Sequence, residues 1–333
     1  MDMLKDLCAA SGVSGGEDEI REVIKNKLAG FDTYVDAMGN LLTESGGRGK
    51  RIMFAAHMDE VGLIISGIDD NGFLRFKTVG GINTAVLTGK KVYIGENKVP
   101  GIIGFRAVHL QEKDERDREL LDKNLYIDIG ATTREEAEVA VNLGDYAVFD
   151  FRFMEFGDRL FCAKALDDRA GCAIMLDILG KHKSKNLCMA FTAQEETGTR
   201  GAQAAAEYFK PDIAVVIETT ICADTFPVPA HMSATFLGAG PVVTFMDRTS
   251  TPDREVMDSI IETAKKHNIP WQFKRTTMGG TDAGVISRAA EGVPTAIIAL
   301  PCRNLHSPST VISLDDYENT AKLLGKWLDE VYK

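Results

Sequence analysis

The sequence predicts an α/β protein in which a mostly parallel sheet is interrupted by a β-rich insertion. After Asp167, apolar strand-like runs alternate with amphipathic helical patterns, which is typical of a parallel sheet with right-handed crossovers. Between residues 67 and 160, short strands instead alternate with turns rich in Gly, Asn and Asp, which favours a small barrel or sandwich. The length agrees with two domains, because 333 residues exceed the roughly 250–300 at which single cores stop growing.

The sheet is expected to begin before the insertion. Residues 17–30 place apolar side chains on one helical face and end at a glycine, so they predict a helix. Residues 31–45 predict a hairpin, and the apolar run 52–56 predicts a strand that ends in His57. We expect this early strand to join the sheet formed by the later part of the chain.

The later part of the chain supplies most of the sheet and its helices. Its predicted strands are residues 186–193, 213–217, 242–245 and 295–300. Its predicted helices are residues 168–180, 199–209, 252–267, 281–290 and 314–331. Residues 1–66 and 161–333 are therefore expected to form one domain.

Residues 67–160 are expected to form the inserted domain. One helix is predicted there, because Thr132 and Glu135 have the spacing of a capping box. The charge-rich residues 111–122 are expected to form a solvated loop or helix face.

Composition and charge narrow the possible partners. The formal charge of −11 argues against nucleic acid and anionic membrane surfaces, since both attract positive charge. The six cysteines show no paired close spacing, which predicts reduced thiols, mostly buried. Charges stand where a signal peptide needs an apolar core, and no apolar run approaches the length of a membrane span. We expect a cytoplasmic protein.

Side chains that can bind a metal follow the predicted strands at five places. They are His57 with Asp59, Asp167 with Asp168, Glu195 with Glu196, Glu218, and His306. Because the carboxyl ends of parallel strands share one edge of a sheet, these side chains are expected to converge. Imidazoles and carboxylates together form a ligand set suited to zinc, cobalt or manganese.

The Asp167-Asp168 pair stands where a strand ends and a helix begins. Two adjacent aspartates repel each other unless a cation lies between or beside them. The alternative is that Asp168 caps the helix and Asp167 is merely solvated. The strand-end residues elsewhere in the chain favour the metal site.

Five motifs, in this order along the chain, resemble the tetrahedral (TET) aminopeptidase family. They are His57-Met58-Asp59-Glu60-Val61-Gly62, Leu166-Asp167-Asp168-Arg169-Ala170-Gly171, Glu195-Glu196-Thr197-Gly198, Gly279-Gly280-Thr281-Asp282-Ala283 and His306-Ser307-Pro308. The resemblance implies a cytosolic two-metal aminopeptidase that removes N-terminal residues from short peptides. Related members include glutamyl and leucyl aminopeptidases, and some have been described as cellulases.

The resemblance also implies an architecture. Residues 1–66 and 161–333 would form a zinc-peptidase catalytic domain. Residues 67–160 would form a small barrel-like dimerisation domain, and the dimers would join into hollow tetrahedral dodecamers.

By the same resemblance, five residues would hold two divalent ions, zinc or cobalt and possibly manganese. Asp167 would bridge the two ions. One ion would be completed by His57 and Glu218, and the other by Glu196 and His306.

Two further residues receive catalytic roles from the resemblance. Glu195, adjacent to a ligand but itself free, would deprotonate the metal-bridging water and return the proton to the leaving amine. Asp59 would accept the second imidazole N–H of His57 and so fix its tautomer and orientation.

Glu218 departs from the pattern of the family, which has Asp at this position. Glu is more typical of related carboxypeptidases and dipeptidases, so a metallohydrolase of that type is the alternative function. Glycoside hydrolysis by Glu195 and Glu196 is a weaker alternative, because adjacent residues diverge and cannot face each other across a sugar. A non-catalytic scaffold with a structural metal site would have no use for a free base such as Glu195.

Other residues of these motifs have milder interpretations. Asp168 and Arg169 are expected to orient the loop that carries Asp167, with helix capping as the alternative. The run Gly280-Thr281-Asp282 is expected to cap the helix that follows it, or else to shape a substrate pocket.

Overall fold

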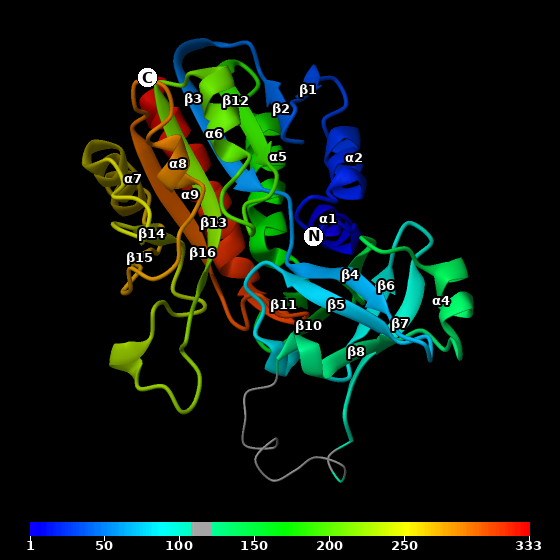
Figure 1. Ribbon diagram of the computed structural model, residues 1–333. Helices are drawn as coiled ribbons and strands as arrows, with labels where there is room; N and C mark the ends of the chain where they lie inside the picture. Colours follow the sequence, from blue (N-terminus) through cyan, green and yellow to red (C-terminus); the bar gives the residue numbers. More distant parts are fainter. Residues whose placement is uncertain (108, 110–120) are drawn as a thin grey trace.

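The computed structural model describes residues 1–107, 109 and 121–333. Its central element is an eight-stranded sheet in the order β1-β2-β12-β3-β13-β16-β14-β15 (Figure 1). The central strands β12, β3, β13 and β16 run parallel to one another. Strand β2 is antiparallel to β12, and β14 is antiparallel to β16. The prediction of a mostly parallel α/β fold is confirmed.

The strands of this sheet lie close to their predicted positions. They are β1 (Thr33–Val35), β2 (Leu41–Glu44), β3 (Arg48–His57), β12 (Lys185–Thr192), β13 (Ile213–Ile221), β14 (Val242–Thr244), β15 (Gln272–Phe273) and β16 (Thr295–Cys302). The predicted hairpin is the antiparallel pair β1 and β2. Strand β13 runs past its predicted end, so Glu218 lies within the strand.

Helices cover both faces of the sheet. They are α1 (Asp2–Ala9), α2 (Asp18–Lys27), α5 (Leu166–Lys181), α6 (Ala202–Phe209), α7 (Arg254–Lys266), α8 (Ala283–Ile286) and α9 (Leu314–Val331). Alternate residues of β3 point to opposite faces: Ile52 and Phe54 pack with α1, α2, α5, α7 and α9, whereas Met53 and Ala55 pack with α6 and α8. Helix α1 was not predicted, and it buries Leu4 and Leu7 in the first of these cores.

The insertion forms a closed antiparallel barrel in the order β4-β5-β8-β7-β6-β9, at the lower right of Figure 1. Its strands are β4 (Gly62–Ile68), β5 (Leu74–Val79), β6 (Lys91–Ile94), β7 (Val99–Phe105), β8 (Leu125–Asp128) and β9 (Tyr146–Phe149). Leu63, Phe76 and Ile127 belong to its own apolar core. The barrel predicted from the short strands and close turns is therefore present.

The barrel and the predicted insertion do not share the same limits. Strand β4 begins the barrel before residue 67, and the barrel ends with β9. The strands β10 (Met154–Phe156) and β11 (Leu160–Ala163) instead form a small sheet with β17 (Thr310–Ser313).

The helix of the insertion, α4 (Arg134–Ala140), begins one residue later than its predicted capping box implies. The side chain of Thr133 accepts a hydrogen bond from the backbone amide of Glu136. The carboxylate of Glu136 in turn accepts a hydrogen bond from the backbone amide of Thr132. Thr132 and Glu135 are therefore not the capping pair. Short 3-10 turns occur at Thr84–Val86, Asp122–Asn124 and Ala230–Met232. Residues 111–120 of the predicted charged loop lie outside the described residues.

Two predictions about the chain as a whole can be compared with the structure. All six cysteines are free thiols, buried except for the half-buried Cys162. Within the described ranges, no helix is long and apolar enough to cross a membrane.

Candidate metal centre

The predicted ligands come from strands and loops that meet at one edge of the large sheet. His57 is the last residue of β3, and it lies beside Thr192, the last residue of β12, in the parallel ladder. The turn that carries Glu195 and Glu196 follows β12 directly. Glu218 is supplied by β13, two strands away from β12. Parallel strands thus bring residues far apart in sequence to a common edge.

Three of the site loops contain a non-glycine residue with a left-handed backbone. They are Ala165 (φ 56°), Gln194 (φ 58°) and His306 (φ 55°). Such conformations cost of order 1–3 kcal/mol each and cluster at functional sites. The surrounding structure must therefore hold these loops in place.

Asp167 lies at the centre of the cluster. Its Oδ1 is 3.2 Å from Nε2 of His57, and its Oδ2 is 3.3 Å from Nε2 of His306. Glu218 Oε2 is 3.8 Å from the same nitrogen of His57. Glu196 Oε2 is 3.5 Å from the same nitrogen of His306. The carboxylate of Asp167 therefore presents one oxygen to each of two groups of ligands.

Each group of three has the dimensions of a metal site. The ligand atoms of His57, Asp167 and Glu218 lie within 4.8 Å of one another, and so do those of Asp167, Glu196 and His306. In the described part of the chain, the buried Oε1 atoms of Glu196 and Glu218 have no hydrogen-bond partner. Buried carboxylate oxygens are normally paired or bound to metal, so these residues fit two divalent cations.

The pKa values of the clustered side chains also indicate that the site requires positive charge. Burial, followed by the charge of Asp167, raises the pKa of Glu196 to about 7. Burial also raises the pKa of Glu218 well above its ordinary value. Burial lowers the pKa of His57, but hydrogen bonds to Asp167 and Asp59 outweigh it and raise the pKa well above normal. The carboxylates thus repel one another and attract protons, and divalent cations would take the place of those protons.

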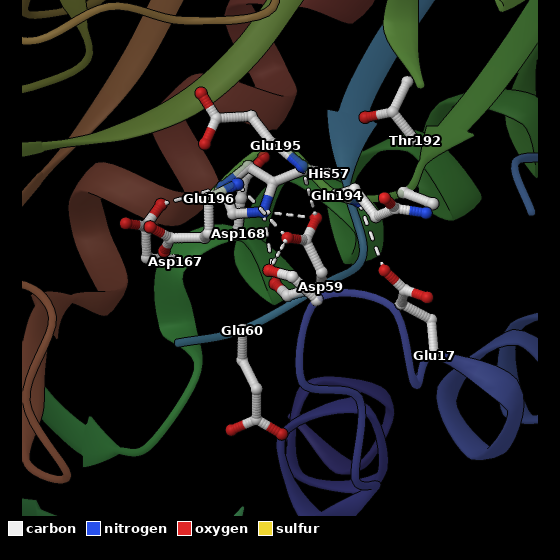
Figure 2. Close-up of polar contacts among 12 residues, drawn as sticks. Glu17, His57, Asp59, Glu60, Asp167, Asp168, Thr192, Gln194, Glu195 and Glu196 are labelled. Carbon is white, nitrogen blue, oxygen red and sulfur yellow. Dashed lines mark hydrogen bonds and ion pairs between the residues drawn. The ribbon is translucent and has the colours of Figure 1, made fainter. Parts of the chain in front are cut away.

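Asp59 connects His57 to the turn after β12. Nδ1 of His57 lies 3.1 Å from the backbone oxygen of Asp59 and 3.5 Å from its Oδ1. The backbone amide of Glu195 donates to Oδ1 (3.0 Å), and that of Glu196 donates to Oδ2 (3.2 Å) (Figure 2). Asp59 therefore contacts the imidazole mainly through its backbone oxygen, and its buried carboxylate holds the backbone of the Glu195–Glu196 turn.

Glu195 belongs to neither group of three ligands. Its side chain is nevertheless close enough to the cluster for burial, together with the charges of Asp282 and Glu196, to raise its pKa well above the ordinary value. A carboxyl with a raised pKa, not itself a ligand, can accept a proton at neutral pH.

The remaining motif residues have structural contacts. Asp167 and Asp168 have non-helical backbones inside α5. Asp168 caps the regular helix that follows them, because its Oδ1 accepts the hydrogen bond from the Gly171 amide at 2.9 Å. Arg169 does not orient the Asp167 loop as expected, since its Nη1 donates to the backbone oxygens of Leu7 (2.6 Å) and Ala10 (3.3 Å).

Asp282 stands at the N-cap position of α8, and its backbone oxygen accepts the amides of Val285 and Ile286. Its side chain makes no capping bond to α8 and instead accepts a hydrogen bond from the Thr192 hydroxyl at 2.6 Å. Asp282 is fully buried behind the end of β12, so its side chain supports the strand rather than the following helix.

Buried polar residues behind the ligands form a second layer that was not predicted from the sequence. They are Ser14, Glu17, Glu60 and Lys164. Two signals were available: Lys164 directly follows an apolar strand, and the polar Ser14-Gly15-Gly16-Glu17 run precedes a helix. Neither signal identifies the residue with which Ser14, Glu17 or Lys164 forms its hydrogen bond or ion pair, because each of these contacts joins residues that are distant in sequence.

A model of the M42 glutamyl aminopeptidase family matches residues 39–323. The chain belongs to this family. This M42 chain is therefore a metal-dependent aminopeptidase, as the five motifs predict. The fold expected for the family is likewise confirmed.

Individual relatives align with this M42 chain along almost its whole length. A protein of Acetivibrio thermocellus is 40% identical over 327 residues, covering 97% of this chain and 96% of the relative. The crystal structure of a TET aminopeptidase from a marine-sediment Thaumarchaeota archaeon has a TM-score of 0.95 at 34% identity, covering 100% and 98% of the two chains. The TET1 peptidase of Pyrococcus horikoshii, which can assemble into a tetrahedron or a large octahedral shell, has a TM-score of 0.87 at 33% identity and 98% coverage of both chains.

Proposed function

We propose that this protein is a two-metal aminopeptidase that removes N-terminal residues from short peptides. The observation that carries the proposal is the position of Asp167, with one carboxylate oxygen directed to each of two ligand groups. One ion would be held by His57, Asp167 and Glu218, and the other by Asp167, Glu196 and His306. Zinc or cobalt, and also manganese, suit this mixture of nitrogen and oxygen ligands. Divalent ions held there supply a water of lowered pKa and polarise the scissile carbonyl.

Glu195 is proposed as the general base and acid. Its carboxylate would take a proton from the attacking water and later deliver it to the amine that leaves. Burial favours this role, because the raised pKa of Glu195 brings proton uptake closer to neutral pH. Asp59 would hold the imidazole of His57 and the backbone of the Glu195–Glu196 turn while this exchange occurs.

Glu218 supports a second candidate function. The longer side chain places its carboxylate differently from an aspartate, so the site could prefer dipeptides or the carboxyl end of a peptide. The ion that His57, Asp167 and Glu218 would hold could then bind either a free substrate amine or another group of the peptide, and the substrate panel below distinguishes the two functions.

We further propose that the chain works as a cytoplasmic homo-oligomer. Residues 67–160 carry none of the proposed ligands, and the oligomeric Pyrococcus horikoshii peptidase shares the fold of this chain along almost its whole length. The insertion would form dimers, and the dimers a tetrahedral dodecamer that admits short peptides. Replacing the barrel, from the start of β4 to the end of β9, with a Gly/Ser linker should reduce the mass measured by light scattering. A full-length protein that is monomeric at micromolar concentration would contradict the assembly.

The decisive experiment for the activity is a substrate panel with metal-reconstituted protein. Free-amine aminoacyl substrates should be hydrolysed, whereas the same substrates with acetylated amines should not. Dipeptides, peptides with a blocked amino terminus and carboxymethylcellulose test the alternative functions. Preference for blocked peptides cut at the carboxyl end would overturn the aminopeptidase proposal.

A further inference from the structure

The segment from Ser11 to Glu17, here called the N-terminal brace, joins α1 to α2 and lies against the metal centre. Its backbone pairs with the segment that follows His57: the Glu60 amide donates to the oxygen of Gly12 (2.9 Å), and the Ser14 amide donates to the oxygen of Glu60 (3.3 Å). Figure 2 shows the chain that carries Glu17 beside the loop of Asp59 and Glu60. The brace is thus attached to the residues next to a ligand.

Ser14 contacts the residue that orients the site. Its hydroxyl donates a hydrogen bond to Oδ2 of Asp59 at 2.5 Å, and Ser14 is only 4% exposed. The same Oδ2 accepts the Glu196 amide, while Oδ1 accepts the Glu195 amide. The hydroxyl therefore restricts the carboxylate that holds these two amides.

Glu17 holds the backbone amide of the preceding residue in the same turn, Gln194. Its Oε1 accepts the Gln194 amide at 3.2 Å and the Gly15 amide at 2.7 Å, and the residue is buried. Figure 2 shows its side chain directed toward Gln194. Three successive amides, those of residues 194 to 196, are therefore held by two buried carboxylates.

The brace is tightly enclosed. A Cβ added at Gly12 would lie 2.7 Å from Nη2 of Arg169, and one added at Gly16 would lie 2.6 Å from the ring of Tyr146. Gly15 has a φ of +90°, which favours glycine. The brace therefore packs against Tyr146 of the barrel strand β9 and against the buried Arg169, with no room for a side-chain carbon at either glycine.

We propose that Ser14 and Glu17 are positioning residues of the metal centre. They hold the turn of residues 194 to 196, so that the side chain of Glu196 faces its ion and that of Glu195 faces the reacting groups. The left-handed Gln194 needs such support, because its backbone conformation is unfavourable by itself. This inference rests on the proposed roles of Glu195 and Glu196.

The test compares removal of each contact with a matched change in the same part of the chain. Ser14→Ala and Glu17→Ala remove the two contacts. Ser11→Ala and Glu19→Ala are the controls, because the side chains of Ser11 and Glu19 bond to Lys98 and not to the site. Glu17→Gln keeps an amide oxygen where Oε1 accepts both hydrogen bonds, so it should retain most of the function.

The first readout is metal binding, which does not depend on catalysis. The dissociation constant for Zn²⁺, measured on metal-free protein by competition with a chromophoric chelator, should rise about 10–100-fold in Ser14→Ala and Glu17→Ala. The visible absorption of the Co²⁺ form should also change, since it reports ligand geometry. The two controls should match wild type in both measurements.

The second readout is kinetic. At saturating metal, kcat should fall by about 10-fold or more while KM stays near the wild-type value, because the base and not the substrate pocket is displaced. If Ser14→Ala does not fold, Ser14→Cys replaces the hydroxyl with a slightly larger and weaker donor and should show a smaller change in the same direction.

Two results would overturn the inference. One is wild-type metal affinity, Co²⁺ spectrum and kcat in folded Ser14→Ala and Glu17→Ala. The other is an equal loss in the two controls. Wild-type protein that binds Zn²⁺ normally but cleaves no peptide would instead contradict the proposed function, and the metal-binding comparison would still test the brace.

Discussion

Lys164 Nζ lies 2.7 Å from Oε1 and 2.9 Å from Oε2 of Glu60, and both side chains are 2% exposed. Glu60 follows His57 by three residues, and Lys164 precedes Asp167 by three residues. Figure 2 shows Glu60 directed away from the ligand cluster. The ion pair thus ties together, from behind, two of the segments that supply metal ligands.

Removing this lysine should destabilise the fold. Lys164→Met leaves the buried carboxylate of Glu60 with Arg169, whose Nη2 is 3.6 Å away, as its remaining cation among the described residues. We expect the free energy of unfolding in urea to fall by about 3 kcal/mol, the lower end of the range for a broken buried pair. Lys181→Met, which breaks an exposed pair with Asp177, is the control and should stay near wild type. Equal stability of the two variants would show that the buried pair contributes nothing.

Removal of metal should abolish peptide hydrolysis. The two ligand groups share Asp167, so a chelator that strips both ions leaves clustered carboxylates and no Lewis acid. Activity should return on adding Zn²⁺, Co²⁺ or Mn²⁺, and titration should show two ions per chain. Full activity in protein that elemental analysis finds metal-free would refute the mechanism.

Glu195→Gln should separate catalysis from metal binding. The substitution removes a base but no proposed ligand, so kcat should fall by about 10²–10⁴-fold while metal content stays at the wild-type level. Both kcat and the metal content, the latter by elemental analysis, are measured on the same preparation.

Asp167→Asn is the contrasting variant, because it weakens a ligand shared by both ions. Its metal content should fall together with its activity. A Glu195→Gln protein with near-normal turnover would mean that another carboxylate is the base.

Glu218→Asp tests the departure from the aminopeptidase pattern. If the longer side chain sets the position of one ion, the shorter one should retain metal and raise the rate on free-amine aminoacyl substrates relative to dipeptides. The ratio of kcat/KM values for the two substrate classes is the measurement. An unchanged ratio with unchanged metal content would make Glu218 a neutral variation.

The sequence by itself determined the architecture and the place of the site. Apolar runs and turn residues are local properties, so they predicted the strands of the parallel sheet and the barrel strands of the insertion. His57 and Asp167 were also visible locally, because each follows an apolar run at the end of a strand. Parallel topology accounts for the position of His57 at the edge of the large sheet. The strand before Asp167, β11, belongs instead to the small antiparallel sheet, so only the tertiary structure places Asp167 at that edge.

Only the tertiary structure decided how the site is supported. Ser14 and Asp59 are 45 residues apart in sequence, and Glu17 and Gln194 are 177 apart. Asp282 illustrates the same limit: its position before a helix predicted a cap, yet the partner of its side chain is Thr192, 90 residues away. Hydrogen bonds of this kind have no periodicity and no fixed spacing, because the packing of the whole sheet, not the local backbone, brings their partners together.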